Sequence, residues 1–78
     1  MKRRSLNVYI GQQLKKLRGG SGMTLRDLEA SSGVSNAQIC LIEQGKHSPT
    51  ADTLYKLALS LKISPSAFFP KGNPNAHH

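Results

Sequence analysis

The sequence has few residues of the kinds that catalysis, metal binding or covalent cross-linking require. It contains one cysteine, Cys40, so no internal disulfide can form, and this thiol has no partners at metal-ligand spacing. No apolar run approaches the roughly 20 residues of a membrane span, and the N-terminus lacks the apolar segment of a signal peptide. We therefore expect a cytoplasmic protein without metal or other cofactor.

Acidic residues are also few, and the chain is strongly basic. Lysine and arginine number 11 against 4 acids, which gives a formal net charge of +7 over 78 residues. Such a field favours polyanionic partners, nucleic acid first. The dispersed acids and His47 on a loop form no catalytic constellation, so we expect no enzyme. A core this small leaves no room for a small-molecule ligand.

Helical periodicity and capping residues predict a single all-α domain of five helices with no strand. The expected N-caps are Ser5, Thr24, Ser35, Thr50 and Ser64. The first helix should stop after Arg18, because the glycine-rich residues 19–22 are too flexible to continue it. The fifth should run to Pro70 and bury Phe68. Residues 1–5 then form a basic arm, 6–70 the folded domain and 71–78 a flexible tail.

The most specific pattern lies in residues 24–43, where a short helix, a turn at Gly33 and a second short helix form a helix-turn-helix unit. Gly33 supplies the positive φ that ends the first of these helices. Apolar Leu28, Ile39 and Ile42 fall where two steeply crossing helices must touch. Such a unit is built to place a helix in the major groove of DNA.

From Ile10 to Phe69 the sequence resembles the phage Cro and repressor type of DNA-binding domain, also called xenobiotic-response-element type regulators. The matching motifs are IGQQLKKLR, the two-helix unit with GVS at its turn, IEQGKHSP and TLYKLALSLKIS. The resemblance implies a lambda-repressor-like fold and a transcriptional regulator, a repressor or controller protein that binds a double-stranded DNA operator. It also implies a structural ion pair between Arg18 and Glu43.

Base reading is expected from the N-terminal part and outward face of the second helix of the unit. The expected readers are Asn36, Ala37, Cys40 and Leu41. The Asn36 amide can pair with both N7 and N6 of adenine, a contact worth about 1 to 3 kcal/mol of discrimination, whereas Ala37 and Leu41 can only touch a thymine methyl. The alternatives are a capping or solvent-facing Asn36, and a Cys40 that is either a redox switch or an unreactive filler.

Phosphate contacts would position the protein without reading sequence. The candidates that flank the reading helix are Arg26, Ser35, Gln38, Gln44 and Lys46. The arm residues Lys2, Arg3 and Arg4 reach a minor groove or a phosphate, or else only solubilise the chain. The remaining lysines, Lys15, Lys16, Lys56 and Lys62, fit a solvated surface better.

Two residues depart from the family pattern. Glu29 stands where such proteins usually have alanine, so its carboxylate must lean outward along its methylene stem or spread the helices. Leu25 stands where many members have a glutamine that touches phosphate and braces a base-reading side chain. These changes leave open a domain that keeps the fold and binds DNA weakly.

A symmetric homodimer is expected, because two half-sites give much more specificity than one. The apolar residues left over after the core is filled are Tyr55, Leu59, Ile63 and Phe69. They are predicted to form the twofold interface, unless some of them complete the core. The competing interpretation is a protein-binding module, either an antitoxin that grips a toxin or a bridging module without operator specificity.

Overall fold

The computed structural model describes residues 5–70, which form an all-helical fold with no strand in that range. The helices are α1 (Leu6–Gly20), α2 (Leu25–Ser32), α3 (Asn36–Glu43), α4 (Ala51–Leu61) and the 3-10 helix η1 (Pro65–Phe68). The predicted arm at Lys2, Arg3 and Arg4 and the predicted tail 71–78 lie outside the described residues. The predicted fold class is confirmed.

Two predicted helix ends are wrong. The fifth helix is a single 3-10 turn that ends at Phe68, because Phe69 precedes Pro70 and takes an extended backbone, φ −104 and ψ 152. α1 continues past Arg18 to Gly20, since the Ser21 N–H donates back to carbonyls of its last turn and the Ser21 hydroxyl donates to the Leu17 carbonyl. Local hydrogen bonds therefore offset the flexibility of the two glycines.

Each helix begins at a serine or threonine whose side chain accepts a backbone N–H of the first turn, which supports the five predicted caps. The donors are the N–H groups of Asn7, Asp27, Gln38, Thr53 and Ser66. Polar side chains at the helix starts thus satisfy part of the backbone that the helices leave unpaired.

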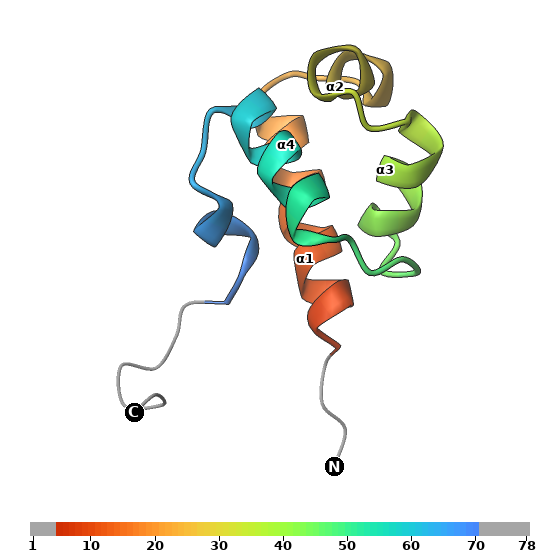
Figure 1. Cartoon of the computed structure of the whole chain (residues 1–78), viewed down its shortest axis with the longest axis vertical. Helices are drawn as coiled ribbons and strands as arrows, with labels where there is room; N and C mark the ends of the chain where they lie inside the picture. The colour runs from red at the N-terminus through yellow and green to blue at the C-terminus, as the bar shows by residue number, and fades with distance from the viewer. Residues whose placement is uncertain (1–4, 71–78) are drawn as a thin grey trace.

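One hydrophobic core holds the helices together. Its fully buried large side chains are Leu14, Leu28, Ile39, Ile42, Leu57 and Phe68. α3 packs on α1 and α2, whereas η1 packs on α1 and α4. Figure 1 shows the result, with α3 and η1 on opposite sides of α1 and α4. The core therefore leaves one whole side of α3 facing away from the rest of the chain.

Gly11 fixes the distance between α1 and α3. A Cβ at this position would lie 2.2 Å from the backbone oxygen of Ile42 and 2.9 Å from that of Glu43. Only glycine permits so close an approach. Because a glycine inside a helix costs about 1 kcal/mol relative to alanine, its presence at position 11 predicts close packing of a neighbouring helix, and the structure confirms this. The end of α3 therefore rests directly on the backbone of α1.

Candidate nucleic-acid interface

The α2–turn–α3 unit is held by local hydrogen bonds. Thr24 and Asp27 form a reciprocal capping box at the start of α2, with N–H to oxygen distances of 2.9 and 3.0 Å. The backbone hydrogen bond from Thr24 holds the pKa of Asp27 below its ordinary value. At the other end Gly33 adopts φ 82, a left-handed conformation that redirects the chain into α3. The turn therefore sets the angle at which α3 leaves α2.

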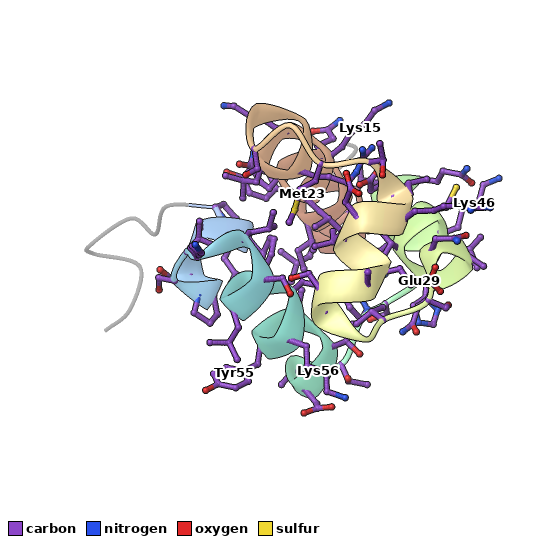
Figure 2. The ribbon with its side chains drawn as sticks, turned by 90° about the horizontal axis from the view of Figure 1, so that it is seen from above. Lys15, Met23, Glu29, Lys46, Tyr55 and Lys56 are labelled. Atoms are coloured by element: carbon purple, nitrogen blue, oxygen red, sulfur yellow. The ribbon has the colours of Figure 1, made fainter. Side chains whose placement is uncertain are left out.

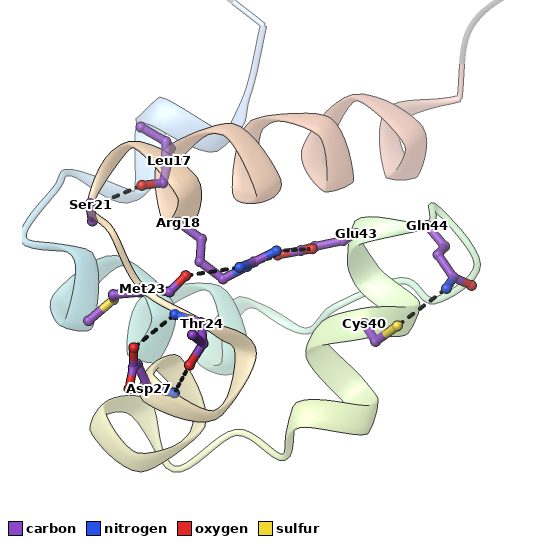
Figure 3. Close-up of polar contacts among 9 residues, drawn as sticks. All are labelled: Leu17, Arg18, Ser21, Met23, Thr24, Asp27, Cys40, Glu43 and Gln44. Atoms are coloured by element: carbon purple, nitrogen blue, oxygen red, sulfur yellow. Dashed lines mark hydrogen bonds and ion pairs between the residues drawn. The ribbon is translucent and has the colours of Figure 1, made fainter.

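Arg18 connects this unit to α1 through two residues. Its Nε lies 2.7 Å from Oε2 of Glu43, and its Nη2 lies 3.0 Å from Oε1 (Figure 3). Its Nη1 donates to the carbonyl of Met23 at 2.9 Å, which also fixes the loop before α2. The hydrogen bond that Arg18 donates to the Glu43 carboxylate raises the pKa of Arg18. The predicted ion pair is present, and it is bidentate and largely buried.

The outward face of α3 carries the four predicted base-reading residues. Ala37 and Leu41 are exposed, Leu41 by 44%, and Asn36 and Cys40 are half-buried. Their spacing brings them to one side of the helix, opposite the buried Ile39 and Ile42. The Gln44 amide donates to the Cys40 sulfur at 3.3 Å (Figure 3). An exposed strip of one polar and three small or apolar side chains is thus presented to the surroundings.

The sequence predicts that the Glu29 carboxylate leans outward along its methylene stem or spreads the two helices. In the structure Glu29 is half-buried, and its Oε1 accepts a hydrogen bond of 3.0 Å from Nδ2 of Asn36. Figure 2 places Glu29 on the part of α2 that faces α3. The sequence separation of seven residues across a turn gives no periodic signal for such a contact. In the sequence, the only sign of a special role for this position is a carboxylate where such proteins usually have alanine.

The predicted phosphate-binding residues lie on α2, at the two ends of α3 and in the loop that follows it. Arg26, Gln44 and Lys46 are exposed and Gln38 is half-buried, whereas the Ser35 hydroxyl already accepts the N–H of Gln38 as the cap of α3. Lys46 follows Gly45, whose φ of 75 turns the chain at the end of α3. Figure 2 shows Lys46 on the α3 side of the molecule, away from Tyr55.

The four residues predicted for a dimer interface are not equally exposed. Tyr55 is 55% exposed, Leu59 60% and Phe69 39%, but Ile63 is half-buried against the core. The alternative that some of these residues complete the core therefore applies to Ile63. A cavity of about 550 Å³ opens between α1 and η1, and Tyr9, Leu17 and Phe69 contribute to its lining. The cavity therefore lies at η1, which is on the side of α1 and α4 opposite α3 (Figure 1).

Between residues 5 and 70 the chain carries neither a membrane-spanning helix nor a cluster of metal ligands. None of the helices between residues 5 and 70 combines the length and hydropathy needed to cross a membrane. Within the part of the chain that the structure describes, no three histidine, cysteine, aspartate or glutamate side chains gather at a distance suited to a metal ion. What the fold and the α2–α3 geometry define is a helix-turn-helix DNA-binding domain.

Known proteins agree with that class. The Helix-turn-helix family model matches residues 14–68. The HTH-type transcriptional regulator y4dJ of Sinorhizobium fredii is 38% identical over 59 residues, which are 76% of this chain and 77% of that one. The HTH-type transcriptional repressor RghR of Bacillus subtilis is 46% identical over 55 residues, 69% of this chain but only 41% of the relative.

A solved structure extends the agreement to three dimensions. The restriction-modification controller protein C.AhdI from Aeromonas hydrophila superimposes with a TM-score of 0.78 at 30% identity, covering 81% of this chain and 96% of that one. The chain belongs to the helix-turn-helix family, and it is a DNA-binding regulator of transcription. The proteins of this family that it resembles are transcriptional regulators, a transcriptional repressor among them, and a controller protein.

Proposed function

We propose that the chain binds an operator in double-stranded DNA with α3 in the major groove and represses or controls a promoter. The observation that carries this proposal is the division of α3 into two sides. Its inner side is fixed by Gly11 and by the Arg18–Glu43 ion pair, while Ala37 and Leu41 stand free on the outer side. A rigidly held helix with an unoccupied face suits insertion into a groove.

Asn36 is the leading base-reading residue in this proposal. It is the first residue of α3, where a recognition helix meets base edges. Its amide offers both a donor and an acceptor, which adenine can satisfy in the major groove, while Leu41 would contact a thymine methyl and Cys40 would lie beside it. An operator half-site rich in A·T pairs follows.

The exposed polar side chains of α2, of α3 and of the loop after α3 would supply the sequence-independent part of binding. Arg26 and Lys46 are exposed and would reach phosphates, and Gln44 would do so by giving up its hydrogen bond to the Cys40 sulfur. Gln38 and Ser35 lie at the start of α3, where backbone N–H groups add donors. The net charge of +7 would favour the same encounter. The arm residues Lys2, Arg3 and Arg4 are proposed as additional contacts in the minor groove or to phosphate.

The DNA-bound form is proposed to be a homodimer. Tyr55 and Leu59, one turn apart on α4, and Phe69 after η1 expose apolar area, while Ile63 is half-buried against the core. A twofold contact there would bury this area and present two α3 helices to successive half-sites. Leu59→Lys would then yield a monomer in sedimentation equilibrium, with the exposed Lys15→Met as the control that alters one charge elsewhere.

The same exposed apolar side supports a second candidate function. A protein partner such as a toxin could cover Tyr55, Leu59 and Phe69 in place of a second copy, and the domain would then act as an antitoxin or bridging module. Under both candidates the chain acts by binding and not by catalysis, without a cofactor or a small-molecule ligand. Its site of action would be the cytoplasm, where DNA and the transcription machinery are present.

A titration against the DNA upstream of its own gene tests the proposal. Wild type, Asn36→Ala and a matched loss of an exposed amide on α1, Gln12→Ala, are compared on that DNA and on a scrambled duplex at several salt concentrations. We expect a preference of about a thousandfold for the upstream DNA, kept by Gln12→Ala and largely lost by Asn36→Ala. Equal and steeply salt-dependent binding to both duplexes would contradict it and favour the protein-partner candidate.

A further inference from the structure

We propose that Glu29 is a positioning residue for base reading, which holds the Asn36 amide in one orientation and thereby favours adenine over guanine. The inference rests on the proposed function, because it concerns how α3 reads DNA. The inference goes beyond the proposed function because it assigns part of the base specificity to Glu29, a residue of α2 that need not touch a base.

The contact between the two side chains is direct. Nδ2 of Asn36 lies 3.0 Å from Oε1 of Glu29, and both residues are half-buried where α2 and α3 meet. Glu29 comes from the second turn of α2 and Asn36 opens α3, so the bond joins the supporting helix to the reading helix across the Gly33 turn. The side chain of Asn36 is therefore held by a residue of α2.

The use of the other acids shows that this pairing is unusual within the chain. The sequence has four acids in all. Asp27 closes the capping box of α2, Glu43 pairs with Arg18, and Asp52 pairs with Lys56. Over residues 5–70, Glu29 is the one acid whose carboxylate accepts a hydrogen bond from a side-chain amide. A carboxylate beside a surface proposed to bind a polyanion weakens the attraction, so a specific benefit is needed to offset it.

The benefit follows from the chemistry of the amide. A carboxylate can only accept, so the nitrogen of Asn36 must face Glu29 and Oδ1 must face the other way. One amide hydrogen is then held by Glu29, and the second remains available for N7 of a purine. Oδ1 can accept from N6 of adenine, but it would meet the O6 acceptor of guanine. A free amide could rotate and donate to O6; the held amide cannot.

The test measures base preference position by position. A randomised DNA duplex library is selected with wild type, Asn36→Ala, Glu29→Ala, Glu29→Gln and the double variant Glu29→Ala/Asn36→Ala. Glu29→Ala is expected to fold, because alanine fits a position between closely packed helices. Glu29→Met is the second variant in case Glu29→Ala has a lowered melting temperature, since methionine keeps an unbranched side chain of similar length but has no strong hydrogen-bond acceptor. Asp52→Asn removes the same charge at the start of α4 and is the matched control.

We expect wild type to prefer A·T over G·C about tenfold or more at the base pair that Asn36→Ala relaxes. Glu29→Ala and Glu29→Met should lower that preference at least threefold at this pair alone. Glu29→Gln should keep most of it, because the glutamine oxygen still accepts. In the Asn36→Ala background, Glu29→Ala should change the base preference no further. Asp52→Asn should leave every preference intact.

Three outcomes would overturn the inference. Unchanged A·T preference in Glu29→Ala and Glu29→Met would remove the positioning role while the proposed function stands. A loss spread evenly over all base pairs, together with a lower melting temperature, would reduce Glu29 to a structural role. Failure of wild type to select any sequence would overturn the proposed function and the inference with it.

Discussion

The two sides of α3 are built on opposite principles. On the inner side Ile39 and Ile42 are fully buried, and the backbone of α1 touches the helix at Gly11. On the outer side Ala37 and Leu41 are exposed and make no contribution to the core. The comparison teaches that the position of the helix is determined by one set of residues and its chemistry toward a partner by another, so each set can be changed separately.

The largest effect on folding is expected from Gly11→Ala. The new Cβ would lie 2.2 Å from a backbone oxygen of α3, so the helices must separate, and we expect a loss of about 3 kcal/mol in the free energy of unfolding. Chemical denaturation measures it. Gly19→Ala is the matched control on the same helix, since nothing lies within 4 Å of its Cβ, and it should be neutral or stabilising. Equal effects at the two glycines would refute the close contact.

The next effect is expected from the ion pair on the inner side. Arg18→Met leaves the Glu43 carboxylate, only 8% exposed, without its partner, and should destabilise the fold by about 2 to 3 kcal/mol. Lys56→Met breaks the exposed pair with Asp52 and should cost no more than about 0.5 kcal/mol. Thermal and urea unfolding of both variants provide the measurement. Similar losses would mean that burial does not distinguish the pairs.

A smaller effect is expected from acid, because Asp27 lies fully in solvent. Its pKa in the folded chain is lowered below 3.8, first by the backbone hydrogen bond from Thr24. Its stabilising contribution is therefore complete above that value and is lost as the pH falls through the lower, folded pKa. Urea unfolding at a series of pH values below about 4 should show a steeper loss for wild type than for Asp27→Asn. If the free energy of unfolding fell equally with pH in both proteins, the capping box would not be the source of the acid sensitivity.

The smallest effect on folding is expected on the outer side. Lys46→Ala should change the free energy of unfolding by less than about 0.5 kcal/mol, because the side chain is exposed. It should nevertheless weaken binding to all DNA sequences alike and lower the slope of log affinity against log salt by about 1. Lys15→Ala, with an exposed lysine on α1, should leave that slope unchanged. A loss of stability in Lys46→Ala would show that the two sides are not separate.

Features that follow from residue type and local sequence pattern could be predicted from the sequence. The five caps, the positive φ of Gly33 and the close approach at Gly11 follow from residue types that have few alternative roles. The Arg18–Glu43 pair came from the family resemblance, since 25 residues separate its members and periodicity gives no hint of it. The assignment of Phe68 to the core is also confirmed.

Features that depend on small differences in local energy or on the angle between helices could not be predicted. Whether α1 ends at Arg18 or Gly20 depends on hydrogen bonds of Ser21 that no sequence pattern encodes. The bond from Asn36 to Glu29 exists only because α2 and α3 cross at an angle that brings them together. Of the apolar residues predicted for a dimer interface, Leu59 is exposed and Ile63 is half-buried, and this difference similarly depends on how the chain after α4 packs against the core.

The pairing of the acids has a consequence for how fast a regulator of this kind finds its target. Asp27, Glu43 and Asp52 are all engaged within the fold, while the chain as a whole carries a net charge of +7. A surplus of this size accelerates diffusional encounter with DNA and permits sliding along it, and added salt slows both. The speed of the search would then be a property of the whole surface, and the dwell time at a site a property of α3 and of the residues beside it.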